Sequence, residues 1–180
     1  MKKILVGVLV FFIAAACQQK QEQKPAAQMP PGQIQSQEEV TLLQEVLRKD
    51  PRNGEAWIKL GNILMDTNRF NEAVDSYQKA LDIDPKNVDV RVDMGVCYRN
   101  SGRADAAEKE FRKAIELNPS HVTAHKNLAI VLAYDLNDTA AAVKEFEKAL
   151  QLAPNAPDAE RIKVEIQKLK AAKSQGGVHK

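Results

Sequence analysis

The chain has 180 residues, of which 26 are lysine or arginine and 24 are aspartate or glutamate. Its formal net charge of only +2 leaves no basic excess, which excludes the electrostatic footprint of a nucleic-acid-binding protein. The length allows one compact domain or one short array of repeats.

The first 16 residues have the pattern of a signal peptide. Two lysines precede a run of thirteen uncharged, mostly apolar residues, 4–16. A transmembrane helix needs about 20 apolar residues, so this run fits the shorter apolar region of a signal peptide. Three alanines and then Cys17 close the run. This arrangement resembles the signal of bacterial lipoproteins, although Ala14 stands where that family usually has leucine.

The resemblance implies that residues 1–16 are removed and that Cys17 becomes the lipid-carrying first residue of a membrane-anchored chain. Gln18 follows the cysteine in place of aspartate. In Gram-negative lipoproteins this implies the outer membrane, with the domain facing the periplasm of the cell envelope. Ala14 and Ala16 also fit an ordinary signal-peptidase site, which would release a soluble protein, so this alternative stays open.

Residues 17–36 are predicted to form a disordered tether between the membrane and the folded domain. The stretch 18–37 contains eight glutamines and three prolines but no aromatic residue. Such a segment cannot bury enough apolar surface to offset the entropy of ordering its chain. Residues 173–180 are predicted to be a disordered tail, because chain ends fray unless they are docked.

The middle of the chain is a repeat. A proline recurs every 34 or 35 residues, at Pro51, Pro85, Pro119 and Pro154. A period of 20 to 50 residues is typical of stacked helical or strand repeats. Aligned on this period, the sequence divides into three copies at residues 54–87, 88–121 and 122–156.

The three copies resemble the tetratricopeptide repeat (TPR), which is a pair of antiparallel helices. The first copy meets the TPR pattern at Trp57, Leu60, Gly61, Leu64, Phe70, Ala73, Tyr77, Ala80 and Pro85. The second meets it at Met94, Gly95, Tyr98, Gly102, Ala107, Phe111, Ala114 and Pro119, and the third at Leu128, Ala129, Leu132, Ala142, Phe146, Ala149 and Pro154. The departures are Arg91 and His125 in the place of Trp57, and one extra residue near 136–139, which falls in a turn where an insertion is tolerated.

The resemblance implies an all-α superhelix of three helix-turn-helix repeats. Small residues would let the two helices of a repeat approach, and large residues would fill the seam between neighbours. Because each proline ends a helix, we expect helices at 54–67, 70–83, 88–101, 104–117, 122–135 and 139–152. A single helix at 36–51 would precede the array with Val40, Leu43, Val46 and Leu47 on its inner face. A capping helix at 157–172, with Ile162, Ile166 and Leu169 inward, would complete a domain of residues 37–172.

No catalytic motif is recognisable, since the sequence has no glycine-rich phosphate loop, no G-x-S-x-G, no H-E-x-x-H and no paired C-x-x-C. We therefore expect neither an enzyme nor a cofactor or metal site. His121 and His125 have the spacing of a helical metal site but no third ligand nearby, so they are interpreted as a helix-start residue and a packed imidazole. Cys97 is expected to be a buried thiol, and no internal disulfide forms once Cys17 is acylated or removed.

TPR proteins bind peptides or proteins along a concave face lined by the first helix of each pair, and the resemblance implies the same here. The candidate groove residues are Ile58, Asn62, Met65, Val92, Val96, Arg99, Lys126, Asn127, Ile130 and Tyr134. Four of them, Ile58, Val92, Val96 and Ile130, would form an apolar stripe, and exposed apolar patches mark interfaces. The alternative is that the first or last helix covers part of this groove.

The side chains of the groove favour a partner segment that is apolar. Ile58 stands where the carboxylate-clamp branch of the TPR family has a lysine, so that ligand is not expected. An apolar segment, extended or helical, would fit the stripe, with Arg99 and Lys126 as flanking polar contacts.

Together these features favour a non-enzymatic scaffold or adaptor that holds a protein or peptide near the envelope membrane. The array and its preceding helix resemble the periplasmic repeat region of cytochrome c maturation proteins, which present apocytochrome. They resemble more loosely the outer-membrane lipoproteins that assist pilus or envelope assembly. Two alternatives remain: a structural subunit that self-associates through the apolar stripe, and a regulator of an envelope enzyme.

Overall fold

The computed structural model describes residues 31–176, with side chains from 36 to 172. The predicted signal peptide, Cys17 and most of the predicted tether lie outside the described residues. Within 31–176 the chain is entirely helical apart from its turns, as predicted. The helices are α1 (Pro31–Lys49), α2 (Gly54–Asp66), α3 (Phe70–Ile83), α4 (Val88–Asn100), α5 (Ala104–Leu117), α6 (Val122–Tyr134), α7 (Thr139–Leu152) and α8 (Ala159–Gly176).

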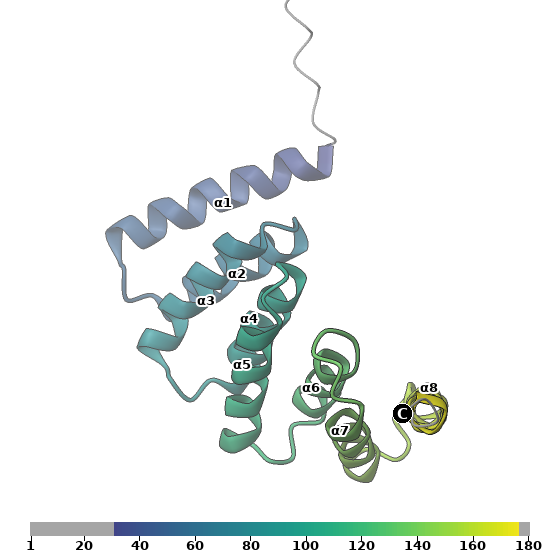
Figure 1. The fold of residues 1–180 in the computed structure, drawn as a ribbon. Coiled ribbons are helices and arrows are strands. Elements are labelled where there is room, and N and C mark those ends of the chain that lie inside the picture. The colour runs from purple at the N-terminus through teal and green to yellow at the C-terminus, as the bar shows by residue number, and fades with distance from the viewer. Residues whose placement is uncertain (1–30, 177–180) are drawn as a thin grey trace, which may run out of the picture. The chain divides into compact units, whose positions relative to one another are not determined.

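The helices pack in chain order, each against the next (Figure 1). α2 with α3, α4 with α5 and α6 with α7 are the three expected antiparallel pairs. α4 also contacts α6, so the first helices of the second and third pairs lie side by side. This arrangement gives the array one face that is lined by α2, α4 and α6, which is the face expected to bind a partner.

Polar side chains cap the starts of α2, α4, α6 and α7. Asn53, Asn87 and Asp138 each accept a hydrogen bond from the backbone N–H three residues further on. His121 does the same at the start of α6, where its Nδ1 accepts from Ala124 N at 3.1 Å. Such caps satisfy one of the backbone donors that a helix start leaves unpaired.

The turn inside each pair has the same backbone conformation. Asn68, Gly102 and Asn137 all have positive φ, of 60°, 77° and 58°. Asparagine and glycine are the residues that adopt this left-handed conformation most readily. The residue inserted in the third repeat lies in its turn, between the end of α6 and the start of α7, where it was predicted.

Close approach of the paired helices depends on glycine. A Cβ atom on Gly61 would lie 2.6 Å from the ring of Tyr77, and one on Gly95 would lie 2.6 Å from the ring of Phe111. Both rings are fully buried. The prediction that a small residue lets the two helices of a repeat approach is therefore confirmed at Gly61 and Gly95, in the first two repeats.

The two end helices differ from the predicted ones in length and in one face. α1 begins at Pro31 instead of 36, with proline at the first helical position where its missing N–H costs nothing. α8 continues to Gly176 instead of 172. Val40 and Leu47 are buried as expected, but Val46 is 43% exposed.

Candidate protein-binding groove

The predicted groove residues all lie on α2, α4 and α6, but the structure does not expose them equally. Ile58, Met65, Val96 and Ile130 are half-buried and pack against the core with one side only. Val92 is only 3% exposed. The prediction that Val92 contributes to an open apolar stripe is therefore wrong: this residue packs into the core that α4 shares with α5 and α6.

At the α2 end, the groove residues mainly support the fold. The Asn62 side-chain oxygen accepts a 2.7 Å hydrogen bond from the hydroxyl of Tyr77. The same hydroxyl lies 3.9 Å from the sulfur of Met65. Burial raises the pKa of Tyr77 far above its usual range, so the hydroxyl stays a donor. Asn62 and Met65 thus help to hold the ring that packs on Gly61.

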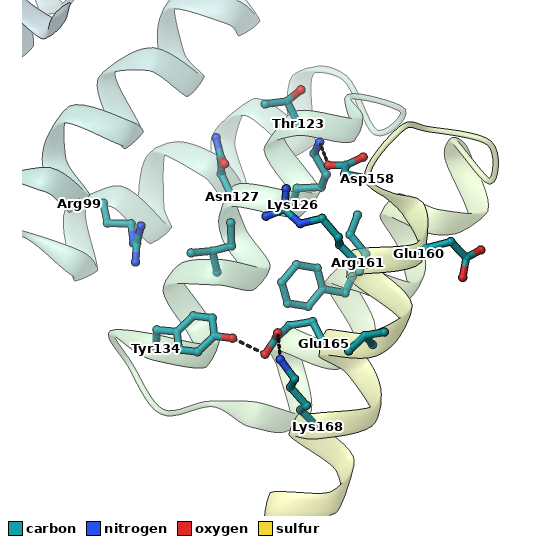
Figure 2. A pocket seen from close by; sticks show the side chains of 14 residues that line it. Arg99, Thr123, Lys126, Asn127, Tyr134, Asp158, Glu160, Arg161, Glu165 and Lys168 are labelled. Atoms are coloured by element: carbon teal, nitrogen blue, oxygen red, sulfur yellow. Dashed lines mark hydrogen bonds and ion pairs between the residues drawn. The ribbon is translucent and has the colours of Figure 1, made fainter.

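At the other end, α4, α6 and α8 enclose a cleft of about 820 Å³. It brings together five of the ten predicted residues, Arg99, Lys126, Asn127, Ile130 and Tyr134. Figure 2 shows their side chains on one wall and those of α8 on the opposite wall. A volume of this size is typical of pockets that enclose several ligand groups.

Two ion pairs of this cleft connect segments that are far apart in the chain. Arg99 Nε lies 2.5 Å from Asp135 Oδ2, and Lys126 Nζ lies 2.6 Å from Asp158 Oδ2. The hydrogen bond from Lys126 lowers the pKa of Asp158. The two cations that were predicted to contact a partner are thus already engaged with acidic groups of the chain itself.

The Tyr134 hydroxyl donates a hydrogen bond to Glu165 of α8, and this bond raises the pKa of Tyr134. Tyr134 is nevertheless 53% exposed, so one side of its ring faces the solvent. Together with the Lys126 contact to Asp158, this bond fixes the distance between α6 and α8. The cleft is therefore held open by polar contacts at two points.

Sequence reasoning missed the α8 wall of the cleft. Asp158, Arg161, Glu165 and Lys168 all line it. Their spacing of three, four and three residues places them on one face of a helix, which could have revealed a second polar surface. The sequence predicted this helix as a cap whose charged residues face water. In the structure, one of its charged faces turns toward α6 instead.

Asp93 is a second feature that the sequence did not reveal. Its side chain is half-buried on α4, and none of the hydrogen bonds or ion pairs within the described residues includes its carboxyl group. Burial, and then the nearby Asp89, raise the pKa of Asp93, while His121 acts in the opposite direction. Asp89 itself is 2.9 Å from His121 Nε2.

The residues considered for chemistry have structural roles. His125 is buried, with Nδ1 2.6 Å from Glu145 Oε2 and Nε2 3.1 Å from the Pro119 carbonyl oxygen. Cys97 is fully buried, and burial raises its thiol pKa to about 12.

Within residues 36–172 no three side chains gather as ligands for a metal ion. No helix in the described range is long and apolar enough to span a bilayer.

Comparison with known families identifies the domain. A family model described as the TPR domain of cytochrome c-type biogenesis protein H matches residues 14–159, which is 146 of the 180 residues. The chain belongs to this TPR family. Its three helix pairs, preceding helix and capping helix are therefore a TPR superhelix, as predicted. A search of curated proteins found no match.

Solved structures show the same TPR fold. The chain is similar to the crystal structure of MamA protein, with a TM-score of 0.70 and 22% identity over 80% of this chain and 78% of that one. It is similar to the TPR domain of Arabidopsis OM64, with a TM-score of 0.60 and 21% identity over 64% and 94% of the two chains.

The similarity extends to a TPR structure that holds a peptide. The first TPR of Spaghetti (RPAP3), bound to the HSP90 peptide SRMEEVD, has a TM-score of 0.62 and 26% identity over 69% of this chain and 96% of that one. No catalytic family is among these matches. The TPR domain is accordingly a module of the kind that binds proteins or peptides.

Proposed function

We propose that this protein is a non-enzymatic adaptor of the cell envelope that binds a segment of another protein in the cleft between α4, α6 and α8. The cleft itself is the observation that carries the proposal. It lies on the face lined by the first helices of the TPR pairs, and Ile130, Phe146 and Val164 give it an apolar lining. Apolar lining with a few fixed polar groups is typical of recognition sites.

The family points to the process in which the adaptor takes part. The matching TPR family is that of a cytochrome c-type biogenesis protein. We therefore propose that the client is a protein in the maturation of c-type cytochromes, in preference to a pilus-assembly client. The peptide complex of a similar TPR supports a protein segment as the ligand, since that TPR is bound to a peptide.

We further propose that the domain is tethered to the outer membrane and faces the periplasm through a lipid on Cys17. The apolar run before this cysteine and the polar stretch after it support a lipoprotein signal. Mass spectrometry of the mature N-terminus tests this. A chain that begins with a diacylated or triacylated Cys17 supports the anchor, whereas an unmodified mature terminus at Cys17 or an intact residue 1 rejects it.

A complementation experiment tests the client. Cells that lack this protein should accumulate less holocytochrome c, and the wild-type chain should restore the level. An Ile130→Glu variant, which places a charge in the cleft, should not restore it. Lys109→Glu on the exposed surface of α5 is the matched control and should restore it fully. Normal cytochrome levels in the deletion strain would reject this client.

A further inference from the structure

More cationic than acidic side chains line the cleft between α6 and α8. Four cations line it, Arg99, Lys126, Arg161 and Lys168, against three acids, Asp158, Glu160 and Glu165. Each acid has a partner: Asp158 pairs with Lys126 at 2.6 Å, Glu160 with Lys163 at 2.7 Å, and Glu165 with Lys168 at 3.6 Å. Arg99 pairs with Asp135, which lies outside the lining.

Arg161 is the remaining cation of the cleft lining. Arg161 is exposed, and no hydrogen bond or ion pair within the described residues includes its guanidinium group. Its contact with Asp158 is long-range only, and Asp158 already has Lys126 as its closer partner. Among the described residues that line the cleft, Arg161 is therefore the cation without an acidic partner.

The position of Arg161 makes this charge available to a ligand. Figure 2 shows its side chain extending from α8 into the cleft, whose lining on α6 includes Lys126 and Asn127. Asn127 is half-buried, and none of the side-chain hydrogen bonds within the described residues includes its carboxamide. A guanidinium group and a carboxamide that line the same cleft provide several N–H donors, and the nearby Asp158 is already bound by Lys126.

The apolar groups lie beside this polar pair. Ile130 and Phe146 line the same cleft, together with the exposed Val164 of α8. A ligand that fills the cleft would bury an apolar side chain against them while it presents an acceptor to Arg161 and Asn127. Arginine binds carboxylates with two parallel hydrogen bonds, which fixes the orientation of the acceptor.

We propose that Arg161, with Asn127, is a receptor for a carboxylate side chain of the bound segment, so that the segment carries aspartate or glutamate next to an apolar residue. This proposal rests on the proposed function, since it names the chemistry of the partner that the same cleft binds. It assigns the recognising cation to α8, outside the three TPR pairs. Lys126 and Arg99 serve to position the helices, because their charges are already paired.

The test uses the mature chain and three capped six-residue peptides. They are identical, with two leucines beside one variable position, which is glutamate, glutamine or lysine. Binding is followed by NMR chemical-shift titration, including the side-chain resonances of Arg161 and Asn127. The glutamate peptide is expected to bind about three- to tenfold more tightly than the glutamine peptide, because a charge-assisted hydrogen bond at an exposed site contributes about 0.5–1.5 kcal/mol. The lysine peptide is expected to bind most weakly.

Two substitutions test whether Arg161 causes the preference for the glutamate peptide. Arg161→Gln should reduce the ratio between the glutamate and glutamine peptides to about one. Lys163→Gln on the same helix removes an equal charge outside the cleft lining and should leave the ratio unchanged. Equal loss in both variants would mean that only the net charge of α8 acts, and this would overturn the proposal.

The remaining outcomes separate this proposal from the proposed function. Equal affinity for the glutamate and glutamine peptides would overturn carboxylate recognition but leave a cleft that binds apolar segments. Failure of all three peptides to shift cleft resonances would also overturn it. The proposed protein binding is tested separately, by crosslinking from the cleft in cells, and its failure there would not depend on the result for the three peptides.

Discussion

Arg91 and Glu110 form a salt bridge between α4 and α5, with 2.6 Å between Arg91 Nη1 and Glu110 Oε2. Arg91 Nη2 also donates to the Pro85 carbonyl oxygen at 3.0 Å. Their side chains are only 13% and 14% exposed. In the first repeat, Trp57 occupies the place of Arg91 and donates to the Pro51 carbonyl oxygen at 2.9 Å.

In the third repeat, His125 and Glu145 form the equivalent pair. His125 contacts the Pro119 carbonyl oxygen and Glu145, as Arg91 contacts Pro85 and Glu110. A polar residue in the tryptophan position is therefore accompanied by a glutamate on the second helix of the pair, whereas the first repeat has Ser76 there. The polar substitutions keep the bond to the preceding proline and add an ion-pair contact between the paired helices.

Removing Glu110 should destabilise the domain. Glu110→Gln would leave the guanidinium of Arg91 largely buried without its counter-charge, and Arg91 Nε already has no hydrogen-bond partner. Loss of one partner of a buried pair costs about 3–5 kcal/mol, and we expect about 2 kcal/mol here because both side chains keep some exposure. Urea unfolding measures the change. Glu108→Gln, which breaks the more exposed pair with Arg112, should change stability by at most about 0.5 kcal/mol.

Gly61→Ala should destabilise the first repeat. Its new Cβ would lie 2.6 Å from the buried ring of Tyr77, so either the ring or the backbone must move. Overpacking of this kind costs about 1–3 kcal/mol. Gly54→Ala is the matched control, because its Cβ would meet Ile83 at 3.5 Å, an ordinary contact. A thermal melt in which both variants lose the same stability would contradict the close-approach argument.

Asp93→Asn should stabilise the domain at pH 7 but not at acidic pH. Burial raises the folded-state pKa of Asp93, so the folded protein binds a proton more readily than the unfolded chain. Stability therefore falls as the pH rises through the titration of Asp93, and the asparagine variant avoids this loss. Melting temperatures at about pH 7 and pH 4 should show a gain at the higher pH that shrinks at the lower. A gain that is independent of pH would indicate another cause.

Cys97 should be unreactive in the folded protein. The thiol is fully buried and burial raises its pKa to about 12, so little thiolate forms at neutral pH. A disulfide-exchange reagent should modify it at least about 100-fold more slowly in buffer than in urea, since modification requires opening of the core. Rapid modification of the native protein would show that α4 does not pack as described.

The fold could be predicted from the sequence because it repeats. Three copies place glycine or alanine, a large ring and a proline at the same interval, so each copy supports the interpretation of the others. The candidate site was predicted only in part, because a groove depends on how neighbouring copies pack. Val92 lies on the middle helix of the three, and its neighbours cover it, while Ile130 keeps one side open. The role of Arg161 depends on the approach of α8 to α6, which no local pattern encodes.

The central claim is that the cleft between α4, α6 and α8 binds a protein segment. The most direct measurement is photo-crosslinking in cells, with a benzophenone amino acid in place of the exposed Tyr134 and, as control, in place of the exposed Lys109 on α5. We expect Tyr134 to capture one envelope protein that Lys109 does not, and mass spectrometry should place the crosslink next to an acidic residue. Equal capture from both positions, or none from Tyr134, would contradict the claim.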